Sequence, residues 1–271
     1  MSETSNELSN LKKKEPPTLI GLLSRADVQQ KIAGLVGDRK AAFISTLLAV
    51  QNGNDALKIC TPLSILSAAI GAAVLNFTVD PNLGFAYIVP YGKKAQLQVG
   101  YKGFVQLALR SGTYKTITAN EVYEGEIVSF NRFLGTFEFG ERKSDKVVGF
   151  FAYFKLLSGS EFSNYMTVQQ VTDHAAKYSK AYQYKKKDSP WFTNFNQMGK
   201  KTALKSLLTK FGELSVDLQN AVSLDQSEVS PAIIEGEVID INTVVVYPDG
   251  NDYVEEPAEI LPEKEKQGGI F

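Results

Sequence analysis

The feature that most constrains the fold is a long strand-like stretch between residues 115 and 167. This stretch is rich in Val, Ile, Phe and Tyr, and charged segments at 140–146 and 158–161 interrupt it as loops. Apolar residues recur at helical spacing before it, from about residue 18 to 52, and further helices are expected after it. Strands that follow one another without helices between them pair antiparallel. The sequence therefore predicts an α+β fold with an antiparallel sheet packed on helices.

A β-hairpin is predicted at residues 84–99, turning near Tyr91 and Gly92. Its second strand alternates between an apolar face and a polar face: Ala95, Leu97 and Val99 against Lys94, Gln96 and Gln98. A short helix over 101–111 follows. Before the hairpin, Thr61 and Pro62 predict the N-cap and first residue of a helix that runs to about Asn76. One side of that helix is small, which permits close packing against another helix (Ser64, Ser67, Ala68, Gly71).

Further helices are expected from about 167 to 178, from 190 to 211 and from 215 to 224. One folded domain is expected at 18–225. Residues 1–17 are polar and charged, and residues 226–271 are acidic and rich in Pro and Gly, so both ends are expected to be disordered. The chain has no apolar run of membrane-spanning length, and its start has no signal-peptide core, so we expect a cytoplasmic protein that does not contact membranes. The single cysteine, Cys60, fits a reducing compartment.

The net charge of −1 conceals a strong division along the chain. Residues 211–271 contain 14 acidic and 2 basic residues, which leaves 27 basic and 16 acidic residues in 1–210. Residues 81–120 contain five cations and no acid, and residues 174–210 contain nine lysines against Asp188 alone. A basic body with an acidic tail indicates a polyanionic partner for the body.

The residues that most enzyme classes need are missing. The only histidine is His174, which excludes a histidine-based triad and any multi-histidine metal site. The nearest approach to a phosphate-binding loop, residues 194–202, lacks its leading glycine and has Gly-Lys-Lys in place of Gly-Lys-Ser/Thr. Asp80 with Glu141-x-Lys143 offers only a weak nuclease pattern.

Two segments suit single-stranded nucleic acid. In the helix at 101–111, Lys102, Gln106 and Arg110 form one polar stripe whose two cations lie about 12 Å apart, near two phosphate steps. Replacing Lys102 and Arg110 with Glu is expected to abolish DNA binding and to leave the fold intact. The alternative is a stripe that only faces solvent.

The second segment, 174–210, alternates aromatic residues with lysines, as proteins do that stack bases and follow phosphates. For Trp191 a core position is the alternative. The helix at 190–211 carries apolar residues on two nearly opposite sides, so it either kinks near Gly199 or buries two faces. The full set of candidate DNA-binding residues is Lys93, Lys94, Gln96, Lys102, Gln106, Arg110, Lys115, Lys177, Lys180, Lys185, Lys186, Lys187, Trp191, Lys200, Lys201 and Lys205.

Several long motifs resemble the signature of the RecT family of phage recombinases. They are 83–92 (LGFAYIVPYG), 96–103 (QLQVGYKG), 107–114 (LALRSGTY), 121–126, 146–154 and 198–205 (MGKKTALK). The resemblance covers roughly 18–225. It implies a protein that coats single-stranded DNA as an oligomer, ring or filament, and anneals it to its complement without ATP. It also implies a single-strand-annealing fold, a phage exonuclease as partner, and competition with the host single-strand-binding protein in a bacterial cell.

No cofactor is expected to be required, although Mg²⁺ is expected to modulate DNA binding. Two rival functions remain open from the sequence. A nuclease or nuclease accessory would act on the same DNA, and a passive protector would bind single strands without annealing them.

Overall fold

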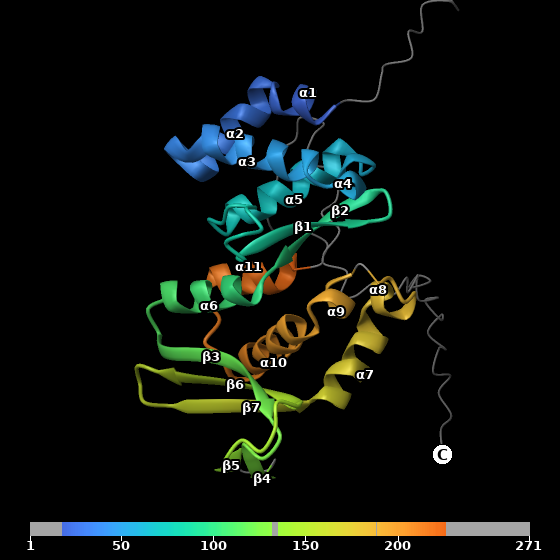
Figure 1. Cartoon of the computed structure of the whole chain (residues 1–271). Helices are drawn as coiled ribbons and strands as arrows, with labels where there is room; N and C mark the ends of the chain where they lie inside the picture. The colour runs from blue at the N-terminus through green and yellow to red at the C-terminus, as the bar shows by residue number, and fades with distance from the viewer. Residues whose placement is uncertain (1–17, 132–134, 188, 226–271) are drawn as a thin grey trace, which may run out of the picture.

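The computed structural model describes residues 18–131, 135–187 and 189–225. They form an α+β fold in which antiparallel strands pack on helices, which confirms the predicted class (Figure 1). The segments expected to be disordered, 1–17 and 226–271, lie outside the described residues.

The N-terminal part is a layer of helices. It consists of α1 (Leu19–Leu23), α2 (Ala26–Val36), the short 3₁₀ helix η1 (Gly37–Arg39), α3 (Lys40–Asn52), α4 (Asp55–Lys58) and α5 (Pro62–Val74). α5 begins at the predicted proline, but Thr61 does not cap it through its side chain. The Thr61 N–H instead donates to the carbonyl of Lys93 at 2.8 Å, which ties the start of α5 to the turn of the hairpin.

The predicted hairpin is present as β1 (Ala86–Tyr91) and β2 (Lys94–Val99), with Tyr91 opposite Lys94. Gly92 has a φ of 61°, a conformation that favours glycine in such a turn. The small face of α5 packs on this hairpin: a Cβ atom at Gly71 would lie 3.1 Å from the Leu97 side chain. Small residues in α5 thus allow close approach to a strand of the same chain, and not only to a helix.

The larger sheet has the order β3-β6-β7, built from β3 (Tyr114–Tyr123), β6 (Val147–Leu156) and β7 (Glu161–Thr167). Between β3 and β6 the chain forms a separate hairpin, β4 (Ile127–Asn131) and β5 (Thr136–Phe139). α6 (Tyr101–Arg110) joins the first hairpin to β3 and packs on β3. Figure 1 shows the β4–β5 hairpin at the end of the molecule opposite α1.

The C-terminal elements are α7 (Val168–Tyr178), α8 (Lys180–Gln183), α9 (Pro190–Thr193), α10 (Phe195–Phe211) and α11 (Val216–Leu224). The helix predicted at 190–211 is split at Asn194, and α10 then continues unbroken through Gly199. A Cβ atom at Gly199 would lie 2.4 Å from the ring of Phe150, so glycine lets α10 lie directly on β6. All residues from Met198 to Leu204 except Lys200 are buried, so α10 buries more than one face, as the second of the two predicted alternatives requires.

Candidate nucleic-acid interface

The turn of the first hairpin presents two of the predicted lysines. Lys93 and Lys94 are exposed, and Gln96 on the same strand is half-buried. The turn is fixed to α5 by two hydrogen bonds: Thr61 N–H to Lys93 O, and Ala95 N–H to the hydroxyl of Ser64 at 2.9 Å. The cations therefore sit on a turn of defined position.

The three residues of the predicted polar stripe of α6 differ in exposure and in contacts. Lys102 is exposed and Gln106 is half-buried. The Arg110 guanidinium donates to the carbonyl of Leu75 at 2.9 Å and lies 4.7 Å from the centre of the Phe77 ring. Arg110 thus satisfies a carbonyl at the end of α5. Reversing the charge of Arg110 would break these contacts, so we now expect that change, unlike a change at Lys102, to weaken the fold.

The segment from α7 to α9 gathers lysines and exposed rings. Lys177, Lys180, Lys185, Lys186 and Lys187 are all exposed. Tyr184 is 73% exposed, and Tyr178 and Phe192 are also exposed. The Lys177 ammonium lies 4.9 Å from the Tyr178 ring, and Phe192 stacks on Tyr182 with ring centres 5.2 Å apart. Cations and rings on one exposed segment can contact both phosphates and bases.

Hydrogen bonds hold the lysine-rich turn of this segment in place. Ser179 caps α8 through its hydroxyl, which accepts from the Tyr182 N–H at 3.2 Å. At the other end, the Lys185 N–H donates to Tyr182 O and the Lys186 N–H donates to Ala181 O, both at 3.0 Å. This pair of bonds is the Schellman arrangement that ends many helices.

Trp191 belongs to the core. It is 8% exposed and packs beside the rings of Tyr182 and Phe195, with centres 6.3 and 6.2 Å away. The alternative of a core position is therefore confirmed, and a base cannot stack on this indole in the structure as it stands.

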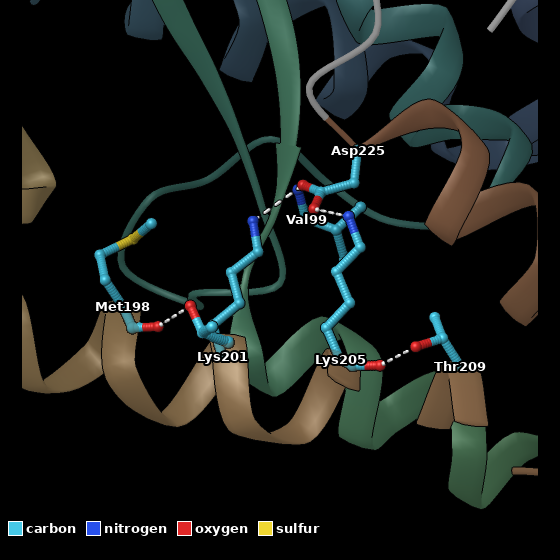
Figure 2. A network of polar contacts seen from close by, with 7 residues as sticks. Val99, Met198, Lys201, Lys205, Thr209 and Asp225 are labelled. Atoms are coloured by element: carbon cyan, nitrogen blue, oxygen red, sulfur yellow. Dashed lines mark hydrogen bonds and ion pairs between the residues drawn. The ribbon is translucent and has the colours of Figure 1, made fainter. Parts of the chain in front are cut away.

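The predicted lysines of α10 have acidic partners inside the protein. Lys200 pairs with Glu121 of β3 at 3.0 Å. Lys201 and Lys205 both pair with Asp225, at 2.8 and 2.9 Å (Figure 2). Lys201 is buried, so its predicted position on a DNA-facing surface is wrong. Lys115, at the start of β3, is exposed.

Asp225 was not expected to be structural, because it stands at the border of the acidic tail. Its carboxylate is 1% exposed and also accepts the N–H of Val99 at 3.0 Å. Burial by itself would raise the pKa of Asp225, but the charges of Lys201 and Lys205 hold that pKa below its usual value. The sequence signal that could have found this partner is weak, since 24 residues separate Lys201 from Asp225.

An aromatic surface on the β4–β5 hairpin was also missed. Phe130 and Phe137 stack with ring centres 4.4 Å apart, and Phe139 is 65% exposed. Phe151 of β6 contacts Phe137 and Phe139 edge to face. The alternation of Phe137 and Phe139 in the sequence was the available signal.

Comparison with known proteins shows which sequences this chain resembles. The family model described as "RecT family" matches residues 41–244. An uncharacterised protein of Bacillus subtilis strain 168, YqaK, is 38% identical over 244 residues, which cover 89% of this chain and 84% of the relative. Protein RecT of Escherichia coli strain K12 is 33% identical over 184 residues, covering 64% of this chain and 66% of that protein.

The chain belongs to the RecT family. Membership places it among DNA-binding proteins of phage-type recombination by single-strand annealing, a group that self-associates and does not hydrolyse its substrate. Among the helices of the described residues, none combines the length and apolar character of a membrane span.

The family motif at 198–205 has a structural explanation in this chain. Gly199 allows the contact with Phe150, and Lys200, Lys201 and Lys205 pair with internal acids. The RecT-family match also includes the hairpin, α6, the larger sheet, α7 to α11 and Asp225, whereas α1 and α2 precede it. The matched range therefore includes residues that are buried or paired inside the protein as well as exposed lysines and rings.

Proposed function

We propose that this protein binds single-stranded DNA and promotes pairing with the complementary strand without nucleotide hydrolysis. The observation that carries the proposal is a group of exposed side chains from α7 to α9, in which five lysines accompany the rings of Tyr178, Tyr184 and Phe192. Family membership supplies the class of reaction.

The chemistry of annealing is base pairing, so the protein has to align two strands that repel each other. Exposed lysines neutralise backbone phosphates and reduce that repulsion. They are Lys93 and Lys94 in the hairpin turn and the lysines of residues 177–187. Exposed rings stack on bases without reading their sequence. A strand held by its backbone and by partial stacking keeps its pairing edges accessible to a complement.

Self-assembly extends this surface along the DNA, as a ring or as a filament. A phage exonuclease would expose the strand, and the host single-strand-binding protein would compete for it. Mg²⁺ would modulate binding by screening phosphate charge without being required. These partners and conditions are part of the proposal.

The Tyr184 ring tests the location of the interface. Tyr184→Ala should weaken binding to a fluorescent oligo-dT by about 1–3 kcal/mol, the usual contribution of one stacked base. Its melting temperature should stay unchanged because the ring is exposed. Phe139→Ala is the matched control, since Phe139 is a similarly exposed ring at the β4–β5 hairpin. Equal loss of affinity in both variants, or in neither, would contradict the proposed location.

A passive protector is the alternative within the same binding chemistry. It would bind the oligonucleotide with the same dependence on Tyr184 and would slow the pairing of complementary strands. A rate measurement on complementary oligonucleotides therefore separates the two functions.

A further inference from the structure

Five lysines and no acid lie in residues 177–187, from the last turn of α7 to the loop before α9, a stretch that we call the lysine segment. All five side chains are exposed. In the part of the chain that the structure describes, none of the five forms an ion pair with a carboxylate. By contrast, Lys155 pairs with Glu161 and Lys200 with Glu121. The lysine segment is thus a positive surface without an acidic partner among the described residues.

Residues 226–263, which we call the acidic segment, have the complementary composition. They contain ten acidic residues and no basic residue. An exposed pair of a lysine and a carboxylate is weak and is screened by salt, but several such pairs act together. Because both segments belong to one chain, the acidic segment meets the lysines at an effective concentration on the order of 1 mM. Contact within the chain is therefore favoured over contact with a more dilute acidic partner in solution.

Asp225 fixes the point from which the acidic segment starts. Its carboxylate is 1% exposed, accepts the N–H of Val99 at 3.0 Å and pairs with Lys201 of α10 at 2.8 Å (Figure 2). Lys201 lies six residues after Phe195, the first residue of α10, which is about 9 Å along the helix axis. α9 contacts both α8 and α10, so it connects the lysine segment to this end of α10 (Figure 1).

The acidic segment is long enough to reach the lysine segment from this point. Three of its acids lie in residues 235–240, which follow Asp225 by 10 to 15 positions. An extended chain of that length spans on the order of 30–50 Å. That reach is several times the distance from Lys201 to the start of α10.

We propose that the acidic segment binds the lysine segment of its own chain and that single-stranded DNA has to displace it. The inference rests on the proposed binding of single-stranded DNA from α7 to α9. DNA offers phosphates to the same lysines, and its bases also stack on the exposed rings of Tyr178 and Tyr184, which carboxylates cannot do. A strand therefore displaces the acidic segment, whereas an anion that offers charge alone competes less well. The contact makes the lysine segment selective for nucleic acid.

Cross-linking of the native full chain tests the contact directly. A carbodiimide joins a lysine amine to a touching carboxylate as an amide. Without DNA, we expect amide links between the lysine segment and the acidic segment, and an excess of oligo-dT should remove most of them. The pair of Lys155 and Glu161 is the control, because it should form a link with and without DNA.

A mixture of isotope-labelled and unlabelled chains shows whether the links form within one chain. Each link should join two peptides that carry the same label. Links between labelled and unlabelled peptides, links that oligo-dT leaves unchanged, or a link at the control pair alone would each overturn the proposal.

Neutralising part of the acidic segment tests its competition with DNA. One full-chain variant replaces four acids of that segment, and the control replaces four exposed acids outside it, so both gain the same net charge. The first carries Asp252→Asn, Glu255→Gln, Glu256→Gln and Glu259→Gln, and the control carries Asp38→Asn, Glu138→Gln, Glu141→Gln and Glu213→Gln. At low salt the first should bind oligo-dT about 5-fold more tightly than the control, and the difference should disappear as salt rises. Equal affinities at low salt would show that the acidic segment does not compete with DNA.

The two measurements separate this inference from the proposed function. Links between the two segments in a native chain that fails to bind oligo-dT would refute the proposed function and leave the contact standing. Binding of oligo-dT by a chain that forms only the control link would refute the contact and leave the function standing.

Discussion

At the scale of single residues, Lys185 is a lysine in a backbone conformation that favours glycine. Its φ of 51° is left-handed, and it occupies the position after α8 where glycine is the usual residue. A lysine there costs about 1 kcal/mol relative to glycine. Lys185→Gly should therefore raise the free energy of unfolding by about that amount and weaken the binding of oligo-dT. Urea unfolding and fluorescence anisotropy measure the two effects, and a less stable variant would contradict the assigned strain.

Arg110 is predicted to behave in the opposite way. Arg110→Ala removes the donor to Leu75 O and the contact with Phe77, so it should lower the free energy of unfolding by about 1–3 kcal/mol. Lys102→Ala, an exposed position on the same helix, should change stability by less than about 0.5 kcal/mol. Urea unfolding of both proteins checks this, and equal stability would show that Arg110 contributes nothing to the end of α5.

Lys102 and Arg110 also show what a single sequence can and cannot predict. A helical period correctly placed Lys102 and Arg110 on one stripe of α6. It could not show that the end of α5 lies within reach of Arg110, because 35 residues separate Arg110 from Leu75. The same holds for Lys201 and Asp225. A single sequence reveals which residues share a face, but distant partners become visible only when the elements are packed.

At the scale of elements, the contact between α10 and β6 depends on one glycine. Gly199→Ala places a methyl group 2.4 Å from the Phe150 ring, so it should destabilise the fold by about 1–3 kcal/mol. Gly34→Ala in α2 is the control, because nothing lies within 4 Å of its Cβ position; it should stabilise by about 0.5–1 kcal/mol. Thermal unfolding should show a lower melting temperature for Gly199→Ala and a higher one for Gly34→Ala than for the native chain. Destabilisation in both would mean that the helical propensity gained by alanine does not decide the effect at position 34.

The elements themselves were largely predictable. The first hairpin, α5, α6, α7 and α11 follow from strict alternation, a proline at a helix start and helical spacing. The separate β4–β5 hairpin was not resolved within 115–167, because strand-like composition does not show which strands share a sheet. The break at Asn194 was also missed, since a single non-helical residue leaves the spacing of apolar residues almost unchanged.

At the scale of the whole molecule, Asp225 links β2, α10 and the end of α11. Its pKa is lowered in the folded state, so its contribution to stability is present above the unfolded pKa, about 3.9, and is lost as the pH falls through the lower folded value. Asp225→Asn leaves two lysines without their carboxylate and should cost about 3–5 kcal/mol at pH 7. The difference in free energy of unfolding between this variant and the native chain should become smaller below about pH 4. Urea unfolding across pH 3–7 checks this, with Asp217→Asn on the exposed side of α11 as the control for net charge. A difference that does not change with pH would contradict the role of the ionised carboxylate.

We proposed above that the whole molecule anneals DNA by binding alone. The direct measurement is the pairing rate of two complementary oligonucleotides carrying a fluorescent donor and acceptor, with the full chain present, ATP absent and EDTA added. We expect pairing to be clearly faster than for the same strands without protein. The acceleration should be lost at high salt, because phosphate contacts weaken as salt rises. Pairing at or below the rate of free DNA, or acceleration only when ATP is supplied, would contradict the proposal.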